Sequence, residues 1–511
     1  MKKRQEQSAK RNGKKIPDFL YYLNFKNLEQ EINRCGYEMK PSRILFYYLL
    51  MILGCAAICV PFKLQPGYII LIVISGFLCL PVVLASAYRQ RYEEARYIEV
   101  SMYISQMLSS FDIKPKILNA LQETREAIVD GPMALAIDEA VDYILYTQFS
   151  EGDIKEEALA IIEKKYSCKR IRTLHKFILN VETNGGEYER TSGLLQKDRE
   201  LWENRVEEFI KDQKAKRVEA TGSIVAVVFI CWLTLAFTNM RQMNMSIDTM
   251  PAYQIATAGL ILSELFIYIK INCSLNVDLL QKLTLRSEKE IRKDYHMVLD
   301  FDNAKESRRS LILSIVPCLI LFYSITTKNM IGIVIGTIML ILALFDHKIG
   351  YSMTKKQLKH EIEFAYPQWL MEMALLLQGN NVRNSIRQTM DGVSPVLKEP
   401  LEKLVADLNM YPDSKIPYQE FLGPLRSKAI ESSMSTLYAV SVGSNGTPER
   451  QIAEIISRTI KMTDKAEAME NQDTMESLKL FFNLPAIPGT IVIFVYMALI
   501  CLAVLNGSAF Y

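Results

Sequence analysis

Seven apolar segments, each 17 to 23 residues long, constrain the fold of this 511-residue chain more than any other feature of its sequence. A helix needs about 20 apolar residues to cross roughly 30 Å of hydrocarbon. Any one such segment could instead be a buried helix of a soluble core, and the short segment 330–346 is the most open to that interpretation. Seven together predict an all-α integral membrane protein, and the segments are 44–62, 67–87, 222–239, 252–269, 311–327, 330–346 and 484–506.

Lys and Arg are distributed unevenly around these segments. The first 43 residues hold 11 of them, and seven crossings that start from that side leave 57 of the 60 basic residues on one side of the membrane. Basic loops stay in the cytoplasm, so we expect the N-terminus inside and the C-terminus outside. The basic start of the chain is expected either to serve only as this anchor or to contact anionic lipid headgroups. The three basic residues on the other side are Lys63, Arg241 and Lys328.

The charged stretches between the apolar segments are helical in pattern, with apolar residues three and four positions apart. On the charge argument they lie in the cytoplasm, in two large modules and a linker. The predicted division is a basic N-terminal segment at 1–43, transmembrane pairs at 44–87, 222–272 and 310–346, cytoplasmic helical modules at 88–221 and 347–483, a cytoplasmic linker at 273–309, and a last transmembrane helix at 484–506.

The two cytoplasmic modules share a pattern of helices and turns. In each, one helix ends at a polar break, at Asp112 in the first and Asn380 in the second, and a later helix ends at an Asn-Gly turn. Asn and Gly tolerate the positive φ with which many helices end. We interpret the chain as two related halves, across about 44–272 and 311–506, although helical hairpins with Asn-Gly turns also recur by chance. The later turns are Asn184-Gly185-Gly186 and Asn445-Gly446.

Two features within the apolar segments could have a role beyond spanning. Glu264 is the one carboxylate well inside a segment, where a charge costs roughly 2.5–3.5 kcal/mol. It is expected either to be protonated or paired with a neighbour, or to contact a membrane substrate. Gly332 and Gly336 form a GxxxG pattern that allows a second helix to approach closely. Packing within the chain and self-association are both open for that pattern.

The sequence carries no motif of an enzyme. It lacks the GxxxxGK[ST] phosphate loop and the GxGxxG dinucleotide motif, its four histidines show no metal-ligand spacing, and no two of its nine cysteines form a CxxC pair. We therefore expect no catalytic, cofactor or metal site and no nucleic-acid partner. The cysteines are interpreted as small hydrophobic residues in a reducing compartment.

Several motifs occur together in a characteristic order. A helix ends in a small-residue turn, an Asn-Gly turn introduces an apolar helix in each half, a basic helix leads into a spanning pair, and a Pro-rich stretch precedes the last span. These are Met373–Asn381, Asn184–Leu195 with Asn445–Ile456, Glu207–Val218, and Pro485 with Pro488. Across about 44–506 the chain resembles the inner-membrane platform proteins of type II secretion and type IV pilus systems, most closely the Tad/Flp branch.

This resemblance implies two cytoplasmic six-helix F-domains and the fusion of two platform subunits. It departs from the family at Asp112, where a small residue is expected, and in the single span that follows the second module. The implied function is a non-enzymatic platform in the bacterial inner membrane that couples a cytoplasmic hexameric secretion ATPase to the assembly of pilin subunits. Self-association into a homo-oligomer is an open alternative to a single copy. A transporter or channel subunit is the main competing class, and a membrane-anchored signalling scaffold is a third.

Overall fold

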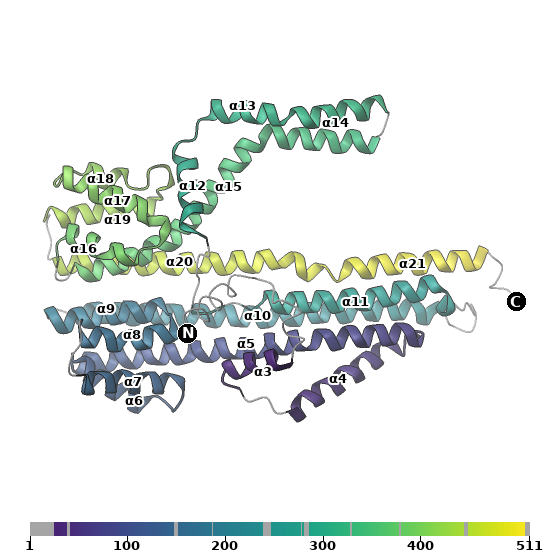
Figure 1. The fold of residues 1–511 in the computed structure, drawn as a ribbon, viewed down its shortest axis with the longest axis horizontal. Coiled ribbons are helices and arrows are strands. Elements are labelled where there is room, and N and C mark those ends of the chain that lie inside the picture. Colours follow the sequence, from purple (N-terminus) through teal and green to yellow (C-terminus); the bar gives the residue numbers. More distant parts are fainter. Residues whose placement is uncertain are drawn as a thin grey trace. The chain divides into compact units, whose positions relative to one another are not determined.

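The computed structural model describes residues 25–37, 41–147, 152–185, 188–238, 247–276, 278–280, 286–327, 330–377, 380–443 and 448–505. Every regular element in these ranges is an α-helix or a short 3-10 helix (Figure 1). The predicted all-α class is therefore confirmed for the part of the chain that is described.

Six stretches of helix are long and apolar enough to cross a membrane. They lie in α4 (Pro41–Cys59), α5 (Pro66–Ile113), α10 (Glu189–Thr238), α11 (Pro251–Ser274), α13 with α14 (Asn303–Leu313 and Ile315–Thr326) and α15 (Met330–Leu376). The seventh predicted segment forms α21 (Ala486–Leu505), whose apolar stretch with described side chains, Ala486–Leu502, is shorter than the other six. These helices indicate a multi-pass membrane protein.

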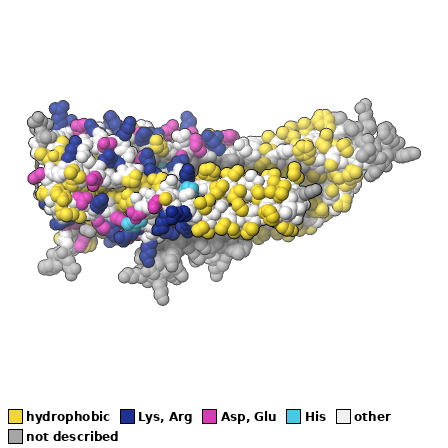
Figure 2. All heavy atoms as spheres, turned by 90° about the horizontal axis from the view of Figure 1, so that it is seen from above, with side chains coloured by type: hydrophobic (Ala, Val, Ile, Leu, Met, Phe, Trp, Pro, Cys, Tyr) yellow, Lys and Arg dark blue, Asp and Glu magenta, His cyan; other side chains and the backbone are white. Residues whose placement is uncertain are grey.

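Large apolar side chains on these helices are exposed, including Phe266, Leu319 and Phe494, which are 69%, 64% and 71% exposed. Hydrophobic side chains form continuous areas of the surface in Figure 2, apart from the areas where Lys, Arg, Asp and Glu gather. Apolar surface of this extent is rare on soluble monomers, whereas a bilayer would cover it. The exposure thus supports the membrane assignment independently of helix length.

The chain forms two compact units. The first contains residues 1–102, 202–282 and 468–511. Its core lies among α4, α5, α10, α11 and α21, where Tyr253 of α11 stacks on Tyr496 of α21 with ring centroids 5.0 Å apart. The Tyr253 hydroxyl donates to the Phe62 carbonyl at 2.8 Å, and the Thr257 and Tyr496 hydroxyls lie 2.6 Å apart. Its remaining described elements are α3 (Phe25–Arg34), η1 (Ile247–Thr249) and the end of α20 (Pro448–Asn483).

The second unit contains residues 103–201 and 283–467, and so combines helices from both halves of the chain. From the first half it takes the end of α5, the start of α10, and α6 (Ile117–Ala127), α7 (Pro132–Tyr146), α8 (Ile154–Tyr166) and α9 (Lys169–Asn184). From the linker it takes α12 (Glu288–Leu299) and most of α13. From the second half it takes α14, α15, most of α20, and α16 (Val382–Thr389), η2 (Met390–Gly392), α17 (Pro395–Met410), α18 (Ile416–Glu420), η3 (Gly423–Leu425) and α19 (Lys428–Ser441).

Helix starts in the second unit follow local capping chemistry. The side chains of Asp153, Ser287 and Asn381 each accept a hydrogen bond from a backbone N–H two or three residues further along, at the start of α8, α12 and α16. Each bond satisfies a donor that has no partner within its helix. Pro132 and Pro395 begin α7 and α17, where proline's missing N–H costs nothing.

The two halves agree in their number of α-helices but not in the lengths of these helices, since the second half also contains η2 and η3 and its α18 has only five residues. Each has six in succession, α5 to α10 and α15 to α20, and the first and last of each run are the longest. The long helices α5, α10 and α15 continue without a break through positions 88, 221 and 347, where the predicted modules meet the predicted spans. The sequence changes between apolar and charged residues at those positions, but the helical hydrogen bonds of the backbone continue through them. The domain boundaries remain a prediction.

Candidate functional site

Arg170 of α9 lies where the two halves of the chain meet in the second unit. Its Nε donates to Asp198 Oδ2 of α10 at 3.0 Å, and its two terminal nitrogens donate to Glu467 Oε1 and Oε2 of α20 at 2.9 and 3.2 Å. The Arg170, Asp198 and Glu467 side chains are only 19%, 15% and 13% exposed. The fork of the guanidinium thus binds one carboxylate from each half, in the bidentate geometry that favours Arg over Lys.

The neighbouring charges in this cluster keep the Arg170 guanidinium ionised. Burial by itself disfavours the charged guanidinium, but the adjacent carboxylates of Asp198 and Glu467 outweigh burial and raise the pKa of Arg170 above its ordinary value. Burial also raises the pKa of Asp198, against the opposing effect of Arg170. The cluster therefore keeps its cation and holds the two halves together through that cation.

A row of further contacts extends the interface along α9 and α15. Lys176 Nζ lies 2.8 Å from Glu372 Oε2, and Asn180 Nδ2 donates to the Leu375 carbonyl at 3.2 Å. The ammonium of Lys169 lies 5.6 Å from the centre of the Phe364 ring. Residues seven, eight or eleven positions apart lie on the same face of a helix, because these spacings are close to whole helical turns. Positions 169, 176 and 180 therefore share one face of α9. Positions 364, 372 and 375 likewise share one face of α15. We call this set, with Arg170, Asp198 and Glu467, the inter-half interface.

His175 lies in a buried hydrogen-bonded chain within the first half. Its Nε2 is 2.8 Å from the Tyr103 hydroxyl, and its Nδ1 is 2.9 Å from Glu163 Oε1. The imidazole is fully buried, and burial lowers the pKa of His175 below its ordinary value. The arrangement joins α5, α8 and α9 and favours a neutral imidazole. Sequence reasoning missed it, although His175 lies on the same face of α9 as the buried residues Ile171 and Ile178.

The predicted turns of the first half are largely described. Asp112 lies in the last turn of α5, and its Oδ2 accepts a hydrogen bond from the Ser192 hydroxyl of α10 at 2.8 Å. Burial raises the pKa of Asp112, partly opposed by that bond. Asn184 is the last residue of α9, and its side-chain amide donates to Asn180 Oδ1 at 2.6 Å. Gly185 follows with φ +68° and donates its N–H to Val181. Gly186 lies outside the described residues.

The turns of the second half are described only in part. Asn380 Nδ2 donates to the Leu376 carbonyl at 3.3 Å, at the end of α15. Asn445 and Gly446 lie outside the described residues. After α19, Gly443 has φ +69°, so a glycine with positive φ follows this helix two residues before the predicted turn.

The residues singled out in the apolar segments occupy packed positions. Gly336 of α15 is buried against α14, where an added Cβ would lie 3.2 Å from both the Cα and the Cβ of Leu321. Gly332 lies one turn earlier on the same helix and is partly buried. Glu264 of α11 is 3% exposed, and neither of its carboxyl oxygens has a hydrogen-bond partner among the described residues.

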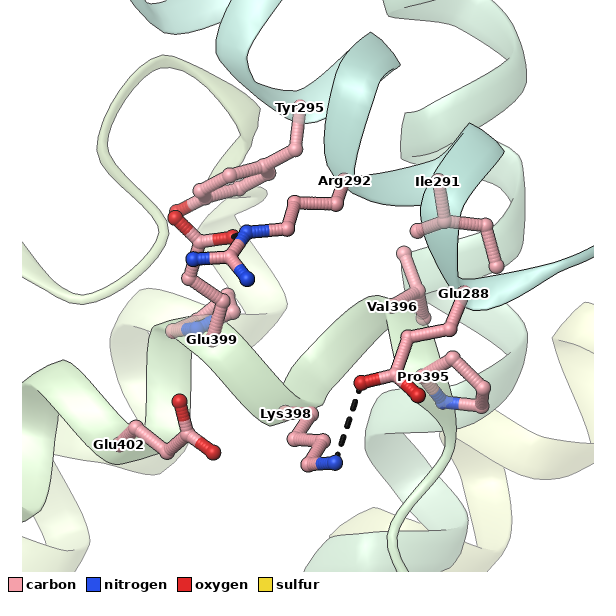
Figure 3. Close-up of a pocket in the computed structure, with 10 residues that line it drawn as sticks. Glu288, Ile291, Arg292, Tyr295, Pro395, Val396, Lys398, Glu399 and Glu402 are labelled. Carbon is pink, nitrogen blue, oxygen red and sulfur yellow. Dashed lines mark hydrogen bonds and ion pairs between the residues drawn. The ribbon is translucent and has the colours of Figure 1, made fainter.

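A small pocket between α12 and α17 is lined by charged side chains and by uncharged ones such as Tyr295 and Val396 (Figure 3). It encloses about 140 Å³. Glu288 pairs with Lys398 at 3.0 Å across it, and Arg292 pairs with Glu399 at 3.5 Å. These pairs use the charges to fasten α12 to α17. The described residues contain no group of three or more His, Cys, Asp or Glu side chains placed to hold a metal ion.

Comparison with known proteins adds no relative. No protein-family model, no curated protein and no solved structure matches this chain.

Proposed function

We propose that this chain is an inner-membrane platform protein of a Tad or type IV pilus machine, or of a type II secretion machine. In this role it couples a separate cytoplasmic hexameric ATPase to the assembly of pilin subunits. The observation that carries the proposal is the inter-half interface: two runs of six helices, each connected to apolar helices, are fastened by buried ion pairs at Arg170 and by the Lys176–Glu372 pair. A platform of this kind needs a polar part that receives force and apolar helices that pass it on.

The long helices suit such a coupling. At 1.5 Å per residue, the 48 residues of α5 and the 50 residues of α10 each correspond to about 70–75 Å of continuous helix. In each of these helices the charged stretch and the apolar stretch follow one another with no loop between them, although α5 contains Pro81 in its apolar stretch. The inter-half interface would make the two polar runs move together.

The partners follow from this role. The chain has no nucleotide-binding motif, so the energy has to come from a separate ATPase. Pilins carry an apolar helix that can lie among the spans. Basic residues near the start of the chain favour contact with anionic lipid and an orientation with the N-terminus inside.

Co-purification tests this proposal. The full-length chain, solubilised from its own membranes with a C-terminal tag, is expected to bring down a hexameric secretion ATPase and pilin subunits, identified by mass spectrometry. The matched control is an unrelated multi-pass protein with the same tag, expressed to the same level. Recovery of neither partner under conditions that keep the chain folded would contradict the proposal.

A transporter or channel subunit is the second candidate, and one observation favours it. Transport proteins place ionisable groups within their spans, and Glu264 is a buried carboxyl within an apolar helix. Solute uptake by vesicles that contain only the purified chain would support this alternative. Uptake no faster than by protein-free vesicles would count against it.

A further inference from the structure

Glu264 occupies an apolar stretch of α11 between two packed clusters. Ile261, one turn before it, belongs to the large core of the first unit, and Ile267, one turn after it, belongs to a smaller cluster with Ala220 of α10. Cys231 of α10 lies close enough to interact electrostatically with the Glu264 carboxyl. With 3% of its surface exposed, the side chain is covered by the protein itself and does not face the surrounding lipid.

The other buried polar side chains of α11 have partners. Gln254 donates to the Lys63 and Asp248 carbonyls at 3.1 and 2.6 Å and accepts from the Gln65 backbone N–H at 2.9 Å. Thr257 bonds within α11 and to Tyr496. Against this pattern, both oxygens of Glu264 lack a hydrogen bond to any described residue. An isolated carboxylate in such a place is strongly unfavourable, and the group neutralises itself instead.

The surroundings decide how it is neutralised. Cys231 of α10 is the titratable group that interacts with the Glu264 carboxyl, whereas Asp248 of η1 and Tyr496 of α21 contact α11 nearer its start, at Gln254 and Thr257. Two cations lie toward the other end of α11: Lys270, six residues after Glu264, and Arg217 of α10, which binds Gln90 and Asn276. Lys63 binds Asp248 at 2.9 Å near the start of α11, so its charge is already used. No ion pair to Glu264 and no metal-ligand cluster is found among the described residues. The remaining 3% exposure leaves no room for a side chain of a partner, whereas a proton needs no room.

We infer that Glu264 is a proton-binding site: the carboxyl carries a proton while α10 and α11 are packed, and releases it only when these helices separate enough to admit water. Protonation is thereby linked to the packing of the span cluster. Any state that opens the cluster is favoured by loss of the proton, and any state that closes it takes a proton up. This inference does not depend on the proposed function.

Infrared difference spectroscopy tests the site directly. The full-length chain in lipid nanodiscs is compared with its Glu264→Gln variant in D2O at neutral pH. We expect the wild type to show the carbonyl stretch of a protonated carboxylic acid that the variant lacks. A carboxylate band that disappears on substitution, with no change in the acid band, would overturn the inference. Asp248→Asn is the matched control, because it removes an ion-paired carboxylate near the same helix and should change only the carboxylate band.

A second measurement needs no variant and covers the case in which Glu264→Gln does not fold. Dicyclohexylcarbodiimide enters apolar regions and reacts with protonated carboxyls: the acid proton moves to a carbodiimide nitrogen, and the carboxyl oxygen bonds to the central carbon to give an O-acylisourea with no leaving group. Peptide mass spectrometry should find the adduct on Glu264 and not on Asp248. Absence of the adduct from Glu264, or its labelling by a water-soluble carbodiimide instead, would overturn the inference.

Discussion

Substituting Arg170 with alanine removes the cation that joins the two halves. The change leaves the carboxylates of Asp198 and Glu467 facing each other at 15% and 13% exposure without a counter-charge. Removing one partner of a buried ion pair lowers the free energy of unfolding by about 3–5 kcal/mol, mostly because the other charge is left unpaired. Because these side chains are far less than one-third exposed, solvent screening reduces that figure only slightly.

Hydrogen–deuterium exchange measures this loss of stability in the helices that form the inter-half interface. If the interface opens locally, the slowest amides of α9 and of the facing part of α15 should exchange roughly 10²- to 4 × 10³-fold faster in Arg170→Ala, since each 1.4 kcal/mol is a factor of ten. Arg172→Ala is the matched control on the same helix, because Arg172 is 52% exposed and pairs with Glu163 at 3.4 Å. A surface pair of this kind contributes about 0–1 kcal/mol, so the control should change exchange by no more than about fivefold.

A third variant separates the unpaired charge from lost packing. A triple variant replaces all members of the cluster with apolar residues of similar size: Arg170→Met, Asp198→Leu and Glu467→Met. It leaves no unpaired buried charge and should restore most of the protection against hydrogen exchange. Equal exchange in Arg170→Ala and Arg172→Ala would refute the claim that the cluster fastens the halves. Failure of the triple variant to regain protection would refute the electrostatic reasoning and leave packing as the cause.

His175, Gly336 and the C-terminus offer three further tests. Burial lowers the pKa of His175 from its ordinary value of 6.5, so the unfolded chain binds a proton at this residue more readily than the folded chain does. Thermal stability should therefore fall as the pH drops below about 6.5, and it should fall less in His175→Gln. Identical pH dependence of the two proteins would contradict this reasoning. Gly336→Ala should lower stability by about 1–3 kcal/mol, because its Cβ would press on the Leu321 backbone, whereas Gly350→Ala on the same helix meets no atom within 4 Å and should be neutral or slightly stabilising in a melting assay. A reporter fused after Tyr511 should be active only on the outer side of the membrane, and cytoplasmic activity would overturn the seven-span topology.

Local sequence patterns predicted the helices well because the causes of those helices are local. The break foreseen at Asp112 falls within the last two residues of α5, and the turn at Asn184-Gly185 coincides with the end of α9, where Gly185 has the expected positive φ. Hydropathy likewise located the apolar stretches of helix. It could not locate module boundaries, because α5 and α10 pass from apolar to charged sequence without a change in backbone.

The inter-half interface could not be predicted from one sequence. Arg170 and Glu467 are 297 positions apart, and each is an ordinary charged residue on a charged helix. Nothing within either segment distinguishes Arg170, at 19% side-chain exposure, from Arg172 two positions later, at 52%. This difference in exposure is created by the packing of α9 against α10 of its own half and α20 of the other half. Glu264, by contrast, was visible in advance because a carboxylate in an apolar segment is conspicuous without any partner.

Filament assembly in living cells tests the platform role most directly. The gene for this chain is deleted from its host, and the strain is complemented with the wild type, Arg170→Ala or Arg172→Ala at equal protein levels. Surface filaments and secreted pilin are then counted by electron microscopy and immunoblotting. The account predicts no filaments in the deletion strain, full recovery with wild type and Arg172→Ala, and a severe defect with Arg170→Ala. Normal filaments and normal secretion in the deletion strain would contradict it.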